Sequence, residues 1–172
     1  VELDAFSPVE RVPRSRNAPL QVLFVGGVGL RKGIRYLLDA MRRLEGTAVR
    51  CRVVGGWGVP PDVLKRHTPP NVQLVGPVPR SQIAAEYARA DVFCLPSLCE
   101  GSAMVIYEAL AAGLPIITTP NAGSIVRNGI DGFLVPPCDA NAIAERLEHL
   151  AKTPGLLEEM SNASRTRASY GS

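Results

Sequence analysis

The chain has 172 residues and a mass of 18.4 kDa, with 46% hydrophobic and 20% charged residues, a composition typical of one folded domain rather than of a disordered segment. A formal net charge of +3 is too small to indicate a nucleic-acid-binding protein, and no apolar stretch is long enough to cross a membrane. The four cysteines have no CxxC spacing and only two histidines are present, so the sequence contains no zinc-site pattern.

The chain then divides into a polar start and a series of short apolar runs. Residues 1–20 are rich in proline and arginine and are interpreted as a linker or arm, which leaves residues 21–172 as the domain. Short, continuous apolar runs are typical of strands that are buried on both faces of a sheet. The predicted strands are 22–25, 52–54, 72–75, 92–95, 115–118 and 132–135. Cys51 and Cys94 lie in apolar runs and are predicted to be buried thiols, which favours a reducing cytoplasm.

Helical patterns lie between most of these runs. The strongest covers 34–44, where apolar residues recur at i, i+3, i+4, i+7 and i+10, and a weaker one covers 61–66. Ser81, Ser102 and Asp139 are predicted to cap helices that end at residues 89, 112 and 150, and a last helix is marked by apolar residues at 156–160. This alternation predicts an α/β fold, a Rossmann-like three-layer α/β/α domain with a parallel sheet of about six strands.

Such sheets bind ligands beyond the carboxyl ends of their strands, which directs attention to the loop 26–33, GGVGLRKG. Glycines let the backbone approach a phosphate, and the following helix start favours negative charge. The loop fits neither GxGxxG, since Lys32 replaces the third glycine, nor the Walker pattern. A dehydrogenase-type dinucleotide binder is therefore disfavoured. The alternative interpretation is a plain turn that carries a solvated basic pair, Arg31 and Lys32.

The segment from Glu100 to Glu108 is a second candidate site. Glu100 is predicted in a loop and Glu108 in the second turn of the next helix, at the edge of its apolar stripe, where a carboxylate could point towards a ligand. The free N–H groups of Ala103 and Met104 would form an anion site at the helix start. Alternatively, Glu100 is only favoured there by the helix dipole, and Glu108 is an ordinary surface glutamate.

Other residues have two interpretations each. Trp57, between glycines, could stack on a base or could anchor a packed loop. The arginines at 42, 43, 50 and 52 are expected to form a solvated face, with contact to an anionic membrane surface as the minor alternative.

Five segments of the sequence, taken in chain order, resemble the C-terminal, donor-binding half of retaining glycosyltransferases of the GT-B fold, family 4. The spacing E-x7-E matches Glu100 to Glu108, and LDAFSP near the start resembles the linker between the two halves of such enzymes. The longer matching phrases are VGGVGLRKGIRYLLDA, VGPVPRSQIAAEYARAD, ADVFCLPSLCEG with YEALAAGLPIITT, and NGIDGFLVPPCDANAIAERLEHL. Together they cover nearly the whole chain.

The resemblance implies a role for particular residues. Lys32 would pair with the diphosphate of the donor, Glu100 would contact the hydroxyls of the donor sugar, and Glu108 would hold the ribose hydroxyls. Lys32 and Glu100 would be the catalytic pair. The backbone at 102–104 would bind the terminal phosphate, and 76–78 would lie along the nucleobase. The donor-binding set implied is Gly26, Gly27, Arg31, Lys32, Pro77, Val78, Glu100, Gly101, Ser102, Ala103, Met104 and Glu108, with no metal and no cofactor besides the nucleotide-sugar substrate.

The sequence departs from the family pattern at two positions. Many relatives have an arginine where Gly27 stands, and Arg31 is the candidate to replace it. Relatives commonly carry an aromatic residue where Ser102 stands, so the wall next to the donor sugar differs and the identity of the sugar stays open.

The resemblance therefore implies a cytoplasmic glycosyltransferase of the hexosyltransferase type, acting on a glycan, lipid or small-molecule acceptor. The acceptor-binding N-terminal half of the family is absent from these 172 residues, so we expect the chain to bind donor but to be inactive alone. The full enzyme could contact a membrane peripherally, and no nucleic acid partner is expected. The alternative is a non-catalytic Rossmann-like interaction module that docks through an apolar face.

Overall fold

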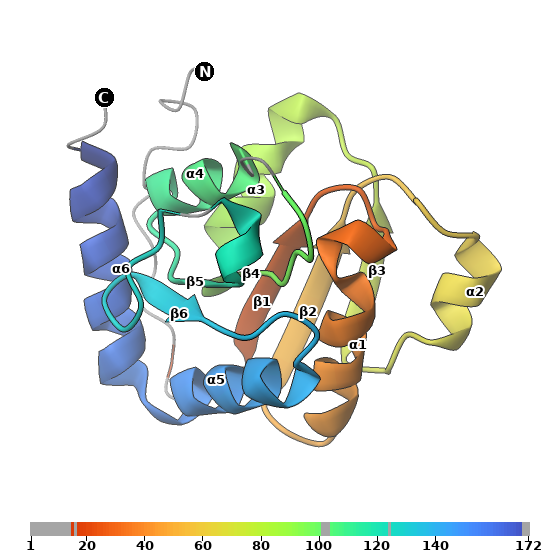
Figure 1. The fold of residues 1–172 in the computed structure, drawn as a ribbon. Coiled ribbons are helices and arrows are strands. Elements are labelled where there is room, and N and C mark those ends of the chain that lie inside the picture. The colour runs from red at the N-terminus through yellow and green to blue at the C-terminus, as the bar shows by residue number, and fades with distance from the viewer. Residues whose placement is uncertain (1–14, 16, 101–103, 124, 170–172) are drawn as a thin grey trace.

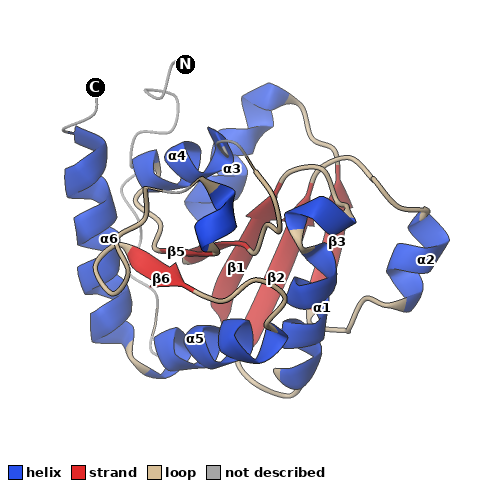
Figure 2. Cartoon of the chain, in the orientation of Figure 1, coloured by secondary structure: helices blue, strands red, loops and turns tan. Residues whose placement is uncertain are grey.

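The computed structural model describes residues 15, 17–100, 104–123 and 125–169. It shows three layers, with a six-stranded parallel sheet between helices (Figures 1 and 2). The strand order is β3-β2-β1-β4-β5-β6. The strands are β1 (Leu20–Val25), β2 (Val49–Val54), β3 (Val72–Gly76), β4 (Val92–Leu95), β5 (Ile116–Thr118) and β6 (Gly132–Leu134). The predicted fold class and strand number are confirmed.

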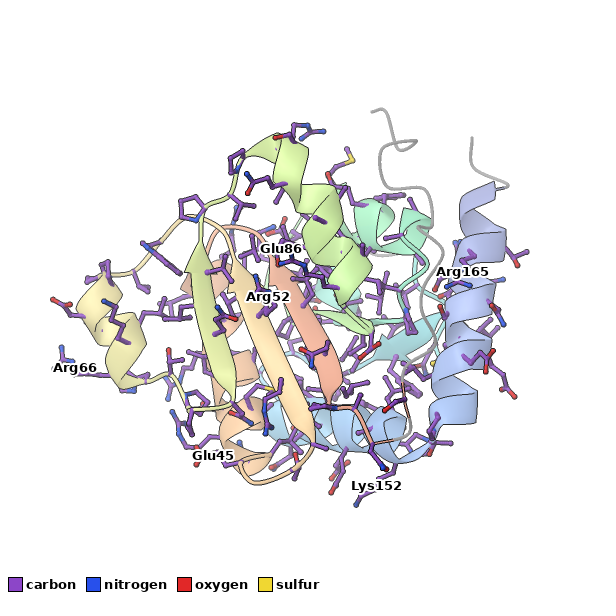
Figure 3. All side chains as sticks on the ribbon, turned by 180° about the vertical axis from the view of Figure 1, so that it is seen from behind. Glu45, Arg52, Arg66, Glu86, Lys152 and Arg165 are labelled. Carbon is purple, nitrogen blue, oxygen red and sulfur yellow. The ribbon has the colours of Figure 1, made fainter. Side chains whose placement is uncertain are left out.

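The strands form where apolar residues can be buried from both faces, and β4 is buried along its whole length. Strand β2 begins three residues earlier than predicted because its first half alternates, with Val49 and Cys51 buried and Arg50 exposed. The charge of Arg52 is accommodated by an ion pair to Glu86 of α3 (Arg80–Arg89), with 2.9 Å between Nε and Oε2. Figure 3 shows these two side chains next to each other, between the sheet and helix α3.

The helices lie on both faces of the sheet. Helix α1 (Ile34–Arg43) packs against α5 (Ala140–Lys152) on one face, whereas α3 covers the other (Figures 1 and 3). Helix α4 (Met104–Ala111) packs against α6 (Pro154–Ser169). The remaining helical segments are α2 (Pro61–Arg66), η2 (Leu30–Lys32) and η3 (Pro120–Ala122). Among the described residues, no helix combines the length and the apolar character needed to span a bilayer.

The predicted helix starts have different outcomes. Asp139 caps α5 as expected, because its carboxylate accepts the N–H of Ala142 at 2.9 Å. The prediction for Ser81 is wrong, since α3 already begins at Arg80, after Pro79, and has no side-chain cap. Ser102 lies outside the described residues.

Helix α6 is longer than the apolar residues at 156–160 indicate. Its middle part contacts the turn between α4 and β5 through hydroxyl groups rather than through apolar side chains. Ser161 donates to the carbonyl oxygen of Gly113 at 2.7 Å, and Ser164 donates to that of Leu114 at 3.0 Å. A search for apolar periodicity does not detect a helix face of this kind.

The predicted burial of Cys51 and Cys94 is confirmed. Burial raises the pKa of the Cys51 thiol to about 12, and burial followed by the nearby Cys51 raises the pKa of Cys94 well above its usual range. Cys99 and Cys138 are exposed.

We therefore expect a disulfide reagent to modify Cys99 and Cys138 rapidly in the native protein, and to leave Cys51 and Cys94 unmodified. Mass mapping of the labelled protein identifies the modified cysteines. Rapid labelling of Cys51 or Cys94 before unfolding would contradict this expectation.

Asp131 ties the turn before β6 to helix α6. Its fully buried carboxylate lies 2.6 Å from Nε of Arg127 and 3.2 Å from a terminal nitrogen of Arg167, and it also accepts the N–H of Arg127 at 2.6 Å. Loss of one partner of a buried ion pair is costly, although here both guanidinium groups can regain water. We expect Asp131→Ala to lower the free energy of unfolding by about 2 kcal/mol in urea titrations. Asp131→Asn keeps an acceptor oxygen, so its free energy of unfolding should fall by less. Equal losses of stability for the two variants would show that this acceptor oxygen contributes nothing.

Candidate functional site

The candidate site lies at the carboxyl ends of the strands. The order of the sheet reverses between β1 and β4, which are neighbours although β2 and β3 intervene in the chain. Ligands of doubly wound sheets bind at such a switch point. The arrows of β1 and β3 in Figure 1 point to this edge, from which the loops that follow the strands emerge.

The loop 26–33 follows β1 and opens α1, as predicted. The N–H of Gly26 donates to Val54 at 3.0 Å, and the N–H of Val28 donates to Gly56 at 2.8 Å, so the loop continues the pairing of β1 with β2. The chain then forms η2 and enters α1 at Gly33, which has a φ of 73°. A Cβ atom at Gly33 would lie 1.9 Å from the carbonyl oxygen of Pro96. The start of α1 is thus held directly against the end of β4.

Lys32 and Glu100 meet at this junction. The Nζ atom of Lys32 lies 2.8 Å from Oε1 of Glu100, and the two side chains are only 16% and 9% exposed. The contact is an ion pair rather than a well-aligned hydrogen bond, because Oε1 has no hydrogen-bond partner among the described residues. The interpretation of Lys32 as a solvated basic group is therefore wrong.

Arg31 contributes a second cation at the rim of the site. Its Nε atom lies 3.9 Å from the same Glu100 oxygen, and its side chain is 71% exposed. Its carbonyl oxygen accepts the N–H of Leu98 at 2.8 Å, which ties the loop after β1 to the loop after β4. Two cations facing one carboxylate leave a positive excess, which favours an anionic ligand.

The backbone fixes the position of Glu100. Its N–H donates to the carbonyl oxygen of Asn121 at 2.9 Å, and the side-chain amide of Asn121 donates to Leu98 at 3.0 Å. Helix η3 after β5 therefore holds the segment that presents Glu100 to Lys32.

Glu108 is buried in the second turn of α4, and the interpretation of this residue as a surface glutamate is wrong. Its Oε2 atom accepts a hydrogen bond from the phenol of Tyr87, at 3.0 Å. Burial, followed by the Glu108 carboxylate, raises the pKa of Tyr87 well above its usual range. The phenol thus stays protonated and orients the carboxylate. Tyr87 lies on a different helix, and no local spacing in the sequence connects it to Glu108.

The other predicted residues differ in their exposure. The side chain of Lys32 folds over Gly26, since a Cβ atom there would lie 3.7 Å from Cε of the lysine. Gly27 is exposed, with open space around it. Pro77 and Met104 are exposed, and Val78 is half-buried. Gly101, Ser102 and Ala103 lie outside the described residues.

The described residues contain no group of three or more histidine, cysteine, aspartate or glutamate side chains that could hold a metal ion. The polar groups that the structure does bring together at the strand ends are cations and paired carboxylates. They can neutralise an anion and accept hydrogen bonds from hydroxyl groups.

Comparisons with known proteins point to one enzyme class. A family model described as "Glycosyl transferases group 1" matches residues 19–153. The putative colanic acid biosynthesis glycosyltransferase WcaL of Escherichia coli is 32% identical over 161 residues, which cover 86% of this chain and 39% of that protein. The chain thus spans about two fifths of the length of this curated relative.

Solved structures share the fold. A sucrose-phosphate synthase from Thermosynechococcus elongatus has a TM-score of 0.83 at 28% identity, over 99% of this chain and 46% of that chain. Anabaena HepE, solved in complex with UDP, has a TM-score of 0.85 at 19% identity, over 99% and 51% of the two chains. At that identity the second comparison shows the fold alone.

Proposed function

The chain belongs to the glycosyl transferases group 1 family, and from this membership we propose that it is the donor-binding domain of a retaining, family 4 glycosyltransferase. The donor is a nucleoside diphosphate sugar, and the acceptor is a glycan, a lipid or a small molecule bound by another part of the enzyme. The observation that carries this proposal is the Lys32–Glu100 pair, which is largely shielded from solvent, with Arg31 beside it, at the switch point of the sheet.

The cations suit the diphosphate. Lys32 lies at the start of α1, where free N–H groups add positive potential. When the bond between sugar and diphosphate breaks, negative charge grows on the leaving oxygens. A cation that is already held in place by Glu100 stabilises this charge without reorganisation. In this proposal Arg31 supplies the second positive charge, in place of the arginine that many relatives have at the position of Gly27.

The carboxylates suit hydroxyl groups. Oε1 of Glu100 has unused hydrogen-bonding capacity next to Lys32, and we assign it to the hydroxyls of the donor sugar. Glu108 shares one oxygen with the Tyr87 phenol, and we assign its carboxylate to the two ribose hydroxyls. In this proposal, Glu100 binds the sugar of the donor and Glu108 binds its ribose.

The proposal gains support from the relatives. WcaL carries a glycosyltransferase name, and HepE was solved with UDP. The name of WcaL favours sugar transfer, and the fold shared with a protein that binds UDP is compatible with a nucleotide-sugar donor. Because the chain spans about two fifths of its curated relative, we place the acceptor site in the remainder of the enzyme. We expect this chain alone to bind donor without transferring the sugar.

Calorimetric titration with UDP, GDP, ADP and their sugar conjugates tests the proposal. We expect saturable binding of at least one nucleoside diphosphate, and weaker binding of the matching nucleoside. If the folded chain binds none of them at millimolar concentration, the proposal is wrong.

Replacement of Glu108 by glutamine separates binding from stability. Glutamine has the same shape and keeps an oxygen for the Tyr87 phenol, so the free energy of unfolding should change by less than about 1 kcal/mol. Loss of the charge should weaken binding of the preferred nucleoside diphosphate about tenfold, whereas pyrophosphate, which lacks a ribose, should bind as before. Calorimetry and urea unfolding measure the two effects.

Glu158→Gln is a matched control, because Glu158 lies exposed on α6. It should alter neither affinity nor stability. If Glu108→Gln unfolds the chain or weakens pyrophosphate equally, Glu108 is a structural group and its assignment to the ribose is wrong.

A further inference from the structure

Trp57 is an aromatic side chain that the site described above does not use. It lies in the loop after β2, at the same sheet edge as Lys32, and it is the only tryptophan of the chain. The residue is 37% exposed, which is unusual for so large an apolar group. An exposed indole beside an anion site has surface available for a flat, partly apolar ligand group.

The backbone of Trp57 is fixed relative to the phosphate-binding loop that we propose. Residues 28 and 57 form an isolated parallel bridge, in which Gly58 donates to Val28 at 2.9 Å and Val28 donates to Gly56 at 2.8 Å. A Cβ atom at Gly55 would lie 1.9 Å from the carbonyl oxygen of Gly26, so the two loops are in close contact. Trp57 therefore does not sit on an independent loop.

The indole ring reaches the end of the next strand. Its Cζ2 atom lies 3.3 Å from where a Cβ atom of Gly76 would stand, and the N–H of Gly55 donates to Gly76 at 2.9 Å. Part of the ring is thus seated against the end of β3, and the rest faces solvent. Because neighbouring strands lie about 4.8 Å apart, the ring is within reach of a nucleotide whose phosphates lie at the end of β1.

We propose that the exposed part of the Trp57 indole stacks on the nucleobase of the donor. This inference rests on the proposed function, because it takes the diphosphate to lie at Lys32 and Arg31. From there the ribose and the base extend along the carboxyl edge past β2 to β3. Stacking accepts any base, since every base has a π-face. Trp57 thus adds affinity for the nucleoside part of the donor and leaves the choice of base to other groups.

The fluorescence of the single tryptophan reports on this contact directly. Emission is excited at the red edge of indole absorption, where nucleotides do not absorb, while UDP, GDP, ADP or inorganic pyrophosphate is added. We expect the nucleoside diphosphate that binds by calorimetry to quench or shift the emission, with the same binding curve. Pyrophosphate should bind with little change in emission.

Two variants test whether the Trp57 indole contributes to the affinity for the nucleotide. Trp57→Leu should weaken the preferred nucleoside diphosphate about tenfold, and Trp57→Phe, which keeps a π-face, should weaken it less. Neither should change the affinity for pyrophosphate. Thermal unfolding of each variant shows whether the loop still packs on Gly76.

The outcomes separate this inference from the proposed function. If a nucleoside diphosphate binds but leaves the emission and both variants' affinities unchanged, the stacking role is wrong and the proposed function stands. If pyrophosphate binding falls as much as nucleotide binding, Trp57 only supports the loops, and the inference is again wrong. If no nucleotide binds the folded chain, both are wrong.

Discussion

Replacing Lys32 with alanine should weaken binding of a nucleoside diphosphate about 10- to 100-fold while leaving binding of the bare nucleoside unchanged. The lysine is held 2.8 Å from Glu100 and is only 16% exposed, so it is already oriented and partly desolvated before a ligand arrives. Its removal deletes a charge-assisted contact to phosphate. It also leaves the Glu100 carboxylate with only the more distant and exposed Arg31 as a partner, so that its negative charge repels the ligand more strongly. Calorimetry with the diphosphate and the nucleoside measures the two affinities.

A surface lysine provides the control. Lys152 forms an exposed ion pair with Glu148 at 2.8 Å, one turn away on α5. Lys152→Ala removes the same charge from the chain and should change neither affinity. If Lys152→Ala and Lys32→Ala weaken the diphosphate equally, net charge rather than a local contact governs binding, and the role of Lys32 is wrong.

The paired variant Lys32→Met with Glu100→Gln separates stability from binding. Lys32→Ala removes the nearest cation from the Glu100 carboxylate, which is only 9% exposed. This loss should also lower the stability of the fold. Removing both charges relieves that cost, so the paired variant should regain stability in urea titrations. Its affinity for the diphosphate should stay low. Recovery of affinity together with stability would mean that Lys32 acts only through the fold.

The layers of the fold could be predicted from sequence because they depend on local patterns. A buried strand such as β4 is a continuous apolar run, and α1 repeats its apolar residues at helical spacing. The cap at Asp139 was predictable for the same reason, since donor and acceptor are three residues apart. The errors occur where polar side chains carry the packing. The start of β2 includes Arg50, and the buried face of α6 uses Ser161 and Ser164.

The candidate site needed the structure because its contacts join distant parts of the chain. The sequence singled out Lys32, Glu100 and Glu108 as types of residue at suggestive positions. It could not show that Lys32 pairs with Glu100, since the loops that carry them follow strands that become neighbours only in the sheet. It also gave no sign of Tyr87 as a partner of Glu108, because the phenol that donates to this carboxylate lies on another helix.

The two carboxylates differ in what compensates their burial. Glu100 faces cations, whereas Glu108 faces a neutral phenol whose raised pKa keeps it a donor. A phenol satisfies one oxygen of Glu108 without neutralising its charge, so that carboxylate stays a strong acceptor for hydroxyl groups. The charge of Glu100 is instead largely offset before a ligand binds. The net charge that a diphosphate meets at this edge is therefore set by Arg31 as much as by Lys32.

Substitution of Gly33 by alanine should cost far more stability than the same substitution at Gly46. Both glycines have a left-handed backbone, with φ of 73° and 78°, so an added side chain is strained by about 1 kcal/mol at either position. At Gly46 nothing lies within 4 Å of the new Cβ atom, but at Gly33 it would lie 1.9 Å from the carbonyl oxygen of Pro96. We expect losses of about 1 kcal/mol for Gly46→Ala and at least about 3 kcal/mol for Gly33→Ala in urea titrations.

The same steric overlap at Gly33 should also disturb the candidate site. Pro96 begins the segment that presents Glu100, and Gly33 directly follows Lys32, so relief of the overlap must push apart the two loops that the ion pair joins. Any folded Gly33→Ala protein should therefore bind the nucleoside diphosphate more weakly, whereas Gly46→Ala should bind it normally. Equal stability losses for the two variants would show that backbone strain alone is responsible. Unchanged affinity in a folded Gly33→Ala protein would show that the junction does not position Lys32 against Glu100.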